Sequence, residues 1–114
     1  MDMLKDASLL RIFIGESDRY EGQALFEWLV LKAREAELAG ATVLRGIMGF
    51  GANSRIVSTK FLRLSQDLPI VVEIVDTHDR LERYLETIDP AVQDGLITLE
   101  KADVRLVRGG KTAH

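Results

Sequence analysis

The chain has 114 residues, of which 46% are hydrophobic and 29% charged, with no cysteine and a formal net charge of −3. This composition is typical of one folded globular domain, and it excludes a disordered chain, a disulfide framework, thiolate metal sites and a cysteine nucleophile. The negative charge opposes general attraction to nucleic acid phosphates or anionic membranes. No apolar run approaches the roughly 20 residues that span a bilayer, and the first residues are too charged for a signal peptide, so we expect a cytoplasmic protein.

The first half of the chain predicts a strand, a helix and a second strand. Residues 8–15 are rich in branched and aromatic side chains and end in glycine, as expected of a buried strand. Over residues 21–39 the apolar positions follow a helical period, and a glycine ends the helix. Trp28 and Leu31 fall outside the apolar stripe, so we expect both on the outer side of this helix. Residues 42–50 predict the next strand.

The second half begins with a polar, basic stretch at residues 51–66, which predicts a protruding loop. Nearly all of residues 69–75 are β-branched, and the proline stands at the first strand position, where it is tolerated. We therefore expect this strand at the centre of the sheet. A second helix follows, with Asp76 or Thr77 as its cap, and an Asp-Pro pair ends it.

Residues 96–99 and 103–108 predict the last strands. The order strand, helix, strand thus occurs twice, which predicts an α+β, ferredoxin-like βαββαβ sandwich with both helices on one face of the sheet. The expected organisation is a single domain (1–114) with a core (8–108), a flexible loop (52–65) and a flexible tail (109–114).

The sheet face turned away from the helices has no predicted cover. It presents apolar side chains with opposite charges among them, namely Arg11, Phe13, Val71, Glu73 and Val75, continued by Arg45 and Ile47. Such a face suits contact with another subunit, where Arg11 and Glu73 could pair. The alternative is a face that stays in water, as antiparallel sheets often allow.

Familiar catalytic and metal-binding motifs are absent from the sequence. The two histidines, His78 and His114, are far apart, and each is explained by its place at a helix start or in the tail. The sequence contains no nucleophile elbow, no His-Glu-x-x-His zinc motif and no complete phosphate-binding loop. We therefore predict no catalytic residue and no metal site.

One group of residues predicts an anion-binding site. Gly46, Gly49 and Gly51 lie at the end of the second strand, next to Arg45. Glycines let backbone amides approach a ligand closely, and arginines grip carboxylate or phosphate oxygens. The loop that follows adds Arg55, Lys60 and Arg63. The alternative is a glycine bulge followed by solvated basic side chains.

The stretch from residue 33 to residue 51 resembles a known family. It contains Leu38-Ala39-Gly40-Ala41-Thr42-Val43, then Arg45-Gly46, then Gly49-Phe50-Gly51. These motifs resemble the PII-like family filed as domain of unknown function 190, and the resemblance extends over residues 9–108. More distantly, the chain is similar to the PII nitrogen-regulatory proteins. These are trimeric sensors that bind adenine nucleotides in clefts between subunits and use a mobile loop to contact transporters or enzymes.

The resemblance implies a ligand site and an effector loop. Gly49, Phe50 and Gly51 match the Gly-Phe-Gly at the base of the PII effector loop, which places the loop at residues 52–65. The loop residues expected to serve the effector role are Asn53, Ser54, Arg55, Lys60 and Arg63.

Two further segments complete the implied site. Asp94 and Gly95 resemble the turn of a second phosphate-binding loop, and Arg105 and Arg108 resemble basic strand residues that grip phosphate. PII proteins have a lysine facing the phosphates where this chain has Leu96, so the resemblance implies AMP or ADP rather than ATP. The loop also lacks the tyrosine that is nucleotidylated in PII proteins.

The resulting hypothesis is a non-catalytic signalling protein. It forms a homotrimer, binds an adenine nucleotide between subunits, has no covalent cofactor and regulates a partner such as a membrane transporter or channel. The first alternative is a small ferredoxin-like enzyme acting on a small anionic substrate. A metal-tolerance trimer of similar architecture is disfavoured because cysteine is absent and histidine is scarce. Nucleic acid binding is disfavoured by the negative charge and the missing stacking aromatics.

Overall fold

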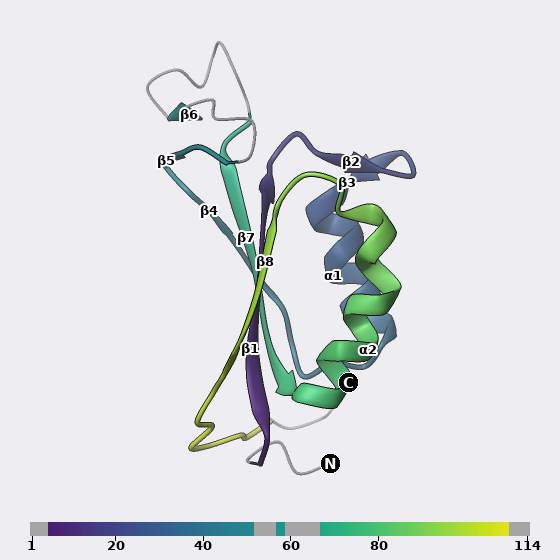
Figure 1. The fold of residues 1–114 in the computed structure, drawn as a ribbon, viewed down its shortest axis with the longest axis vertical. Helices are drawn as coiled ribbons and strands as arrows, with labels where there is room; N and C mark the ends of the chain where they lie inside the picture. The colour runs from purple at the N-terminus through teal and green to yellow at the C-terminus, as the bar shows by residue number, and fades with distance from the viewer. Residues whose placement is uncertain (1–4, 52–56, 59–66, 110–114) are drawn as a thin grey trace.

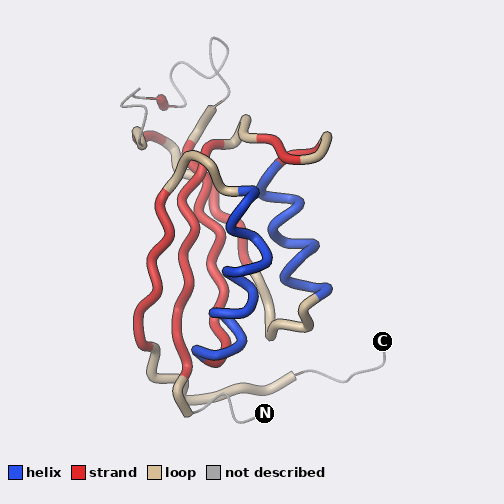
Figure 2. Tube along the Cα trace, turned by 45° about the vertical axis from the view of Figure 1, so that its right-hand side comes forward, coloured by secondary structure: helices blue, strands red, loops and turns tan. Residues whose placement is uncertain are grey.

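Two helices pack on one face of a four-stranded antiparallel sheet (Figures 1 and 2). The computed structural model describes residues 5–51, 57–58 and 67–109. The strand order is β4-β7-β1-β8. These strands are β1 (Ala7–Gly15), β4 (Thr42–Arg45), β7 (Pro69–Thr77) and β8 (Leu96–Lys101), and the helices are α1 (Leu25–Glu35) and α2 (His78–Ile88). The predicted α+β, ferredoxin-like arrangement is confirmed.

Three smaller elements lie outside the four-stranded sheet and its two helices. They are the hairpin of β2 (Arg19–Tyr20) and β3 (Gln23–Ala24), the short pair β5 (Met48–Gly49) and β6 (Val57–Ser58), and the 3₁₀ turn η2 (Asp89–Ala91). The β5–β6 pair and the β2–β3 hairpin both lie at the upper end of the molecule in Figure 1. None of the described helices is long and apolar enough to cross a membrane.

Alternation along the two central strands builds the core. In β1 and β7 every second side chain is buried beneath the helices, including Leu10, Ile12 and Val72. Leu29 of α1 and Tyr84 of α2 meet these side chains from the helix layer. The Tyr84 hydroxyl donates a hydrogen bond to the Leu29 carbonyl oxygen at 2.7 Å. Burial raises the pKa of this hydroxyl, so it stays protonated and remains a donor.

Helix α2 begins and ends where the sequence predicts. Thr77 is its N-cap, and the Thr77 side-chain oxygen accepts a hydrogen bond from the backbone N–H of Arg80 at 3.4 Å. Leu81, Tyr84 and Ile88 lie on the buried face. The helix passes into η2 at the Asp-Pro pair, because Pro90 has no N–H with which to continue the helical hydrogen bonds.

Helix α1 starts later than predicted, because a hairpin precedes it. Glu21 and Gly22 have φ angles of 50° and 84°, the left-handed conformation required at both centres of a two-residue hairpin turn. The hairpin brings Tyr20 onto Trp28, with ring centroids 4.7 Å apart in an edge-on contact. Trp28 is therefore buried, and the prediction that it faces outward is wrong. Leu31, one turn further along, is exposed as predicted.

A buried carboxylate ties the end of α1 to the start of α2. Asp76 is fully buried and accepts a hydrogen bond from the backbone N–H of Ala39 at 2.9 Å. Its second oxygen lies 3.2 Å from Nε of Arg80. The Arg80 guanidinium also donates to the carbonyl oxygens of Ala36 and Glu37, just beyond α1. The Asp76–Arg80 ion pair thus provides hydrogen-bond partners for backbone groups that are left unpaired where α1 ends.

The face away from the helices is open, and its charges are paired within the chain. Arg11 Nε lies 3.0 Å from Glu73, and Arg11 Nη1 lies 2.8 Å from Glu100, so the predicted Arg11–Glu73 pair is confirmed. The side chains of Arg11 and Glu73 are 37% and 31% exposed. Water therefore still reaches this ion pair in the single chain.

The register of β4 corrects the composition of this open face. Directly paired residues share a face, and Leu44 pairs with Val71 whereas Arg45 pairs with Ile70 on the helix side. Thr42 and Leu44 therefore continue the open face, and the expectation that Arg45 does so is wrong. Ile47 lies beyond the end of β4 and is exposed. Arg45 instead reaches Glu16 at 2.6 Å.

The predicted strand at 103–108 is not a strand in the structure. β8 extends to Lys101, and the N–H of Ala102 donates to the carbonyl of Ala7 at 3.0 Å. Beyond that bond the described chain leaves the sheet at the end opposite β5 (Figures 1 and 2). Alternating polarity favours a strand, but a strand also needs a neighbouring strand, and its own sheet provides none here.

Candidate functional site

The glycine motif of the predicted anion site lies where β4 ends and folds back over β7. A Cβ atom at Gly46 would lie 2.9 Å from Cγ of Pro69, and one at Gly49 would lie 3.1 Å from the same atom. Only residues without a side chain allow this close approach. Gly49 belongs to β5, and Phe50 and Gly51 follow it at the surface, with the Phe50 ring 67% exposed.

The second predicted turn lies at the same end of the sheet. A Cβ atom at Gly95 would lie 2.6 Å from the carbonyl oxygen of Phe13, so this position also requires glycine. Asp94 and Gly95 directly precede β8, an edge strand, whereas Gly49 and Gly51 follow β4, the other edge strand. The fold therefore brings both predicted turns to one end of the molecule, separated by β7 and β1.

The segment after β1 connects these parts. Asp18 Oδ2 accepts a hydrogen bond from the backbone N–H of Gly15 at 3.0 Å. Asp67 Oδ1 accepts one from the N–H of Ser17, also at 3.0 Å, and Glu16 pairs with Arg45. Residues 15–18 are thus fixed both to the end of β4 and to the residues that precede β7.

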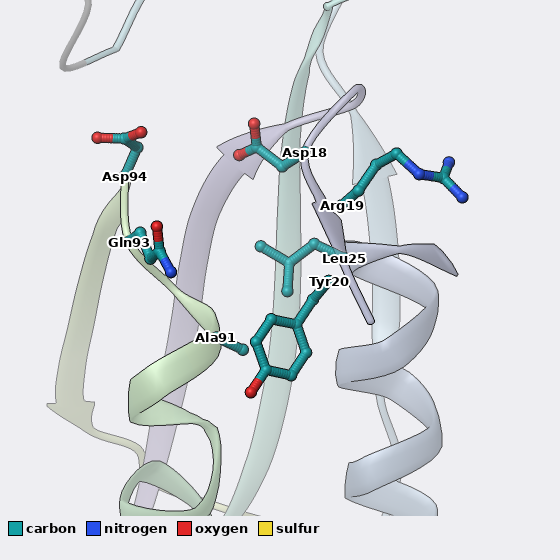
Figure 3. Close-up of a pocket in the computed structure, with 7 residues that line it drawn as sticks. All are labelled: Asp18, Arg19, Tyr20, Leu25, Ala91, Gln93 and Asp94. Carbon is teal, nitrogen blue, oxygen red and sulfur yellow. The ribbon is translucent and has the colours of Figure 1, made fainter. Parts of the chain in front are cut away.

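A cleft of about 140 Å³ opens beside this segment, between the β2–β3 hairpin and the turn before β8 (Figure 3). Its lining residues are Asp18, Arg19, Tyr20, Leu25, Ala91, Gln93 and Asp94. The Arg19 guanidinium points away from the cleft and donates to the carbonyl oxygen of Gly22 at 2.7 Å. The charged groups that remain in the lining of the cleft are therefore the carboxylates of Asp18 and Asp94.

Electrostatics at this end of the chain are unfavourable to a lone anion. Burial raises the pKa of the Asp18 carboxyl, and the carboxylates of Asp67 and Asp94 raise it further, while the hydrogen bond from Gly15 acts in the opposite direction. A phosphate placed here would meet the same negative field. Among the described residues that line the cleft, the one cation, Arg19, is turned away from it.

The predicted phosphate-binding arginines do not lie at this end. Arg105 and Arg108 follow β8 at the opposite end of the sheet (Figure 1). The Arg105 side chain is 82% exposed, with one oxygen of Asp103 at 3.4 Å. A single chain therefore brings Gly49, Gly51 and Gly95 to one end, but it does not bring the arginines to them.

The remaining predicted residues divide between the described and undescribed parts of the chain. Asn53, Ser54, Arg55, Lys60 and Arg63 of the predicted effector loop lie outside the described residues. Within the described ranges, no group of three histidine, aspartate or glutamate side chains is placed to hold a metal ion. His78 lies at the start of α2, with Nδ1 3.5 Å from Ser8 Oγ and Nε2 3.6 Å from Glu82.

Sequence reasoning missed the hairpin side of the cleft. Arg19 and Tyr20 lie between the predicted strand at residues 8–15 and the predicted helix at residues 21–39, where no element was expected, yet they form the first strand of a hairpin that walls the cleft. The signal was Glu21-Gly22, a pair suited to a two-residue turn between two short extended segments.

Comparison with known proteins places the chain in a family. The family model DUF190, described as "Uncharacterized ACR", matches residues 7–104. This chain belongs to the DUF190 family. A UPF0166 protein of Aquifex aeolicus (strain VF5) is 43% identical to it over 96 residues, which cover 84% of this chain and 90% of the relative.

Solved structures share the fold at low sequence identity. One is CPII from Thiomonas intermedia K12, a nitrogen regulatory PII-like protein bound to ADP, AMP and bicarbonate, with a TM-score of 0.65 and 14% identity. The match covers 84% of the DUF190 chain and 85% of CPII. The Bacillus subtilis GlnK–ATP complex gives a TM-score of 0.57 at 13% identity, covering 85% and 82% of the two chains. The predicted PII-like resemblance is confirmed.

Proposed function

We propose that this DUF190 protein is a PII-like regulatory protein that binds an adenine nucleotide in clefts between the subunits of a homotrimer. In this proposal residues 52–65 relay ligand occupancy to a partner such as a membrane transporter or channel. The observation that carries it is the placement of two glycine turns, Gly49 to Gly51 and Asp94 to Gly95, at one end of a PII-like fold. Backbone amides exposed at such turns are suited to phosphate oxygens.

The position of the charges supports a site completed by a second subunit. The carboxylates of Asp18, Asp67 and Asp94 lie close enough together to interact near the turns, so the described residues there place negative charge beside a phosphate. Arg105 and Arg108 are exposed at the far end of the sheet, where they are available to a neighbouring molecule. An arginine–phosphate contact is charge-assisted and bidentate, and it would offset the local negative field.

The open sheet face supports self-association. Phe13 and Val71 stand on it beside the ion-paired Arg11, and no described element covers it. An apolar face of this kind gains free energy when it leaves water, by about 25 cal/mol for each Å² buried. A closed ring of three subunits would cover every copy of the face.

The nucleotide is proposed to be AMP or ADP rather than ATP, and no covalent cofactor or catalytic residue is proposed. Leu96 directly follows the Asp94-Gly95 turn, and its side chain is exposed there. An apolar side chain in this position contributes no charge to a third phosphate. The site is therefore proposed to regulate a partner and not to catalyse a reaction.

Titration calorimetry with AMP, ADP and ATP tests this function directly. We expect saturable binding of AMP and ADP and weaker binding of ATP, in a protein that sedimentation shows to be a trimer at micromolar concentration. The absence of binding heat for all of these nucleotides at millimolar concentration would contradict the nucleotide. A monomer at micromolar concentration would contradict the trimer and its clefts.

A further inference from the structure

The end of the sheet that carries both glycine turns has few basic residues. Its described residues are 15–24, 45–51, 67–69 and 89–96. Among them only Arg19 and Arg45 are basic. The Arg19 guanidinium is turned away from the cleft and donates to the carbonyl oxygen of Gly22. Arg45 is therefore the described cation of this end that remains accessible to an anion.

An ion pair fixes where the Arg45 guanidinium lies. Nη2 of Arg45 is 2.6 Å from Oε2 of Glu16, which directly follows β1. Because β7 lies between β4 and β1, the Arg45 side chain crosses the end of β7 to reach this carboxylate. β1 in turn neighbours β8, which follows the second turn. In the strand order, the guanidinium is thus held between the two glycine turns.

Glu16 is a fixed anchor for this guanidinium. Its backbone N–H donates to the carbonyl oxygen of Leu68 at 2.8 Å, one residue beyond the last pair of β1 and β7, Gly15 with Pro69. The Glu16 side chain is 20% exposed, whereas the Arg45 side chain is 59% exposed. The sheet therefore holds the carboxylate in place, and the arginine bound to it stays accessible to solvent.

The ion pair leaves most of the guanidinium unused. Among the described residues, Nη2 is the one guanidinium nitrogen of Arg45 that has a hydrogen-bond partner. A guanidinium carries its N–H groups in a planar fork, and one edge of this fork can bind two oxygens of a phosphate together. An exposed ion pair adds little to folding stability, but it restricts a flexible side chain to one direction.

We propose that Arg45 contacts phosphate oxygens of the nucleotide and that Glu16 is the positioning residue that holds Arg45 between the turns. This inference deepens the proposed function and rests on it for the identity of the ligand. Arg45 is then a cation that the chain supplies to its own glycine turns. It offsets the negative charge of Asp18 and Asp94 at the same end of the sheet.

Calorimetric titration of the full-length protein with AMP and, separately, with inorganic phosphate tests the contact. We expect Arg45→Ala to weaken the binding of both by about 10- to 150-fold, the usual cost of a lost charge-assisted contact. Arg45→Lys keeps the charge but not the fork, so it should recover only part of this loss. Arg83→Ala, which changes an exposed arginine of α2, is the control and should bind both as the wild type does.

Two variants of Glu16 isolate its positioning role. Glu16→Gln and Glu16→Ala both remove the negative charge, but only glutamine keeps an oxygen that can accept from Arg45 Nη2. A side chain that is not held in place must be ordered when the ligand binds, and this ordering lowers affinity. We therefore expect AMP and phosphate to bind Glu16→Ala about 2- to 10-fold more weakly than Glu16→Gln. Equal affinities of the two variants, with unchanged urea midpoints, would overturn the positioning role.

The outcomes separate this inference from the proposed function. If Arg45→Ala or Arg45→Lys binds AMP as tightly as the wild type, the phosphate contact is overturned and the nucleotide proposal stands. If inorganic phosphate binds and requires Arg45 but AMP, ADP and ATP do not bind, the contact stands and the nucleotide proposal fails. If the wild type binds neither phosphate nor any of these nucleotides, both fail.

Discussion

The two ends of the sheet are built in different ways. At the end where α1 meets α2, the side chains of Asp76 and Arg80 form hydrogen bonds with backbone groups that would otherwise be unpaired. At the end where β4 and β8 meet their turns, close packing depends on glycines and leaves charged and aromatic groups at the surface. The first arrangement is suited to holding the fold, and the second is suited to meeting a ligand or another molecule.

The largest expected effect is at the closed end. Asp76→Ala removes the acceptor for the Ala39 amide and leaves Arg80 with an unpaired charge, so we expect a loss of about 3–5 kcal/mol in the free energy of unfolding. Urea denaturation at fixed protein concentration measures it. Asp79→Ala, an exposed change one turn away, is the control and should cost less than about 1 kcal/mol. Equal effects would show that Asp76 has no special role.

The next largest effect is expected on nucleotide affinity, without a change in the free energy of unfolding. If the proposed site is correct, Arg105→Ala removes a charge-assisted contact to the nucleotide, so we expect AMP affinity to fall by about 1.5–3 kcal/mol, or roughly 10- to 150-fold. The urea midpoint should not change, because among the described residues this side chain contacts Asp103 alone, and that contact is exposed. Arg83→Ala, on the surface of α2, is the matched control and should bind normally. Unchanged affinity in Arg105→Ala would remove this residue from the site.

A glycine at the open end supplies the third test. Gly95→Ala places a methyl group 2.6 Å from the Phe13 carbonyl oxygen, and we expect it to cost about 1–3 kcal/mol of stability. Gly40→Ala meets no atom within 4 Å and is the control, with an expected change below about 1 kcal/mol. Thermal unfolding compares the two. A tolerated Gly95→Ala would mean that the turn before β8 can move away from β1.

The smallest effect concerns pH. The pKa of Asp18 is raised in the folded chain by burial, so the stability linked to its protonation is present at low pH and is lost as the pH rises through the folded pKa. Asp18→Asn keeps an acceptor for the Gly15 amide without the charge. We expect a small increase in the urea midpoint at pH 7 and no increase at acidic pH, where wild-type Asp18 is itself protonated. A decrease at both pH values would contradict the sign of this effect.

Local signals in the sequence were sufficient for much of the fold. The strands β1 and β7 and the Thr77 cap each depend on the types of neighbouring residues, so they were predicted correctly. The hairpin before α1 was missed, although Glu21-Gly22 encodes it, because the apolar period of the helix was extended backwards over it.

Predictions that depend on distant partners failed or stayed open. The face of Arg45 was wrong because a one-residue difference in register exchanges the two faces of a strand, and register is set by β7 rather than by β4 alone. The alternation of residues 103–108 is a strand pattern that has no partner strand in the described part of the chain. The described site residues lie at two turns and in one distant segment. Whether they form one site depends on contacts with other molecules, and a single sequence does not specify those contacts.

The contact between Tyr20 and Trp28 gives the protein an intrinsic optical reporter. Trp28 is the single tryptophan of the chain, and the ring that covers it also lines the cleft beside Asp94. Its emission should change when the hairpin lifts from α1, because indole fluorescence responds to the polarity around the ring. Movement of this one wall of the cleft is therefore measurable in the unlabelled protein.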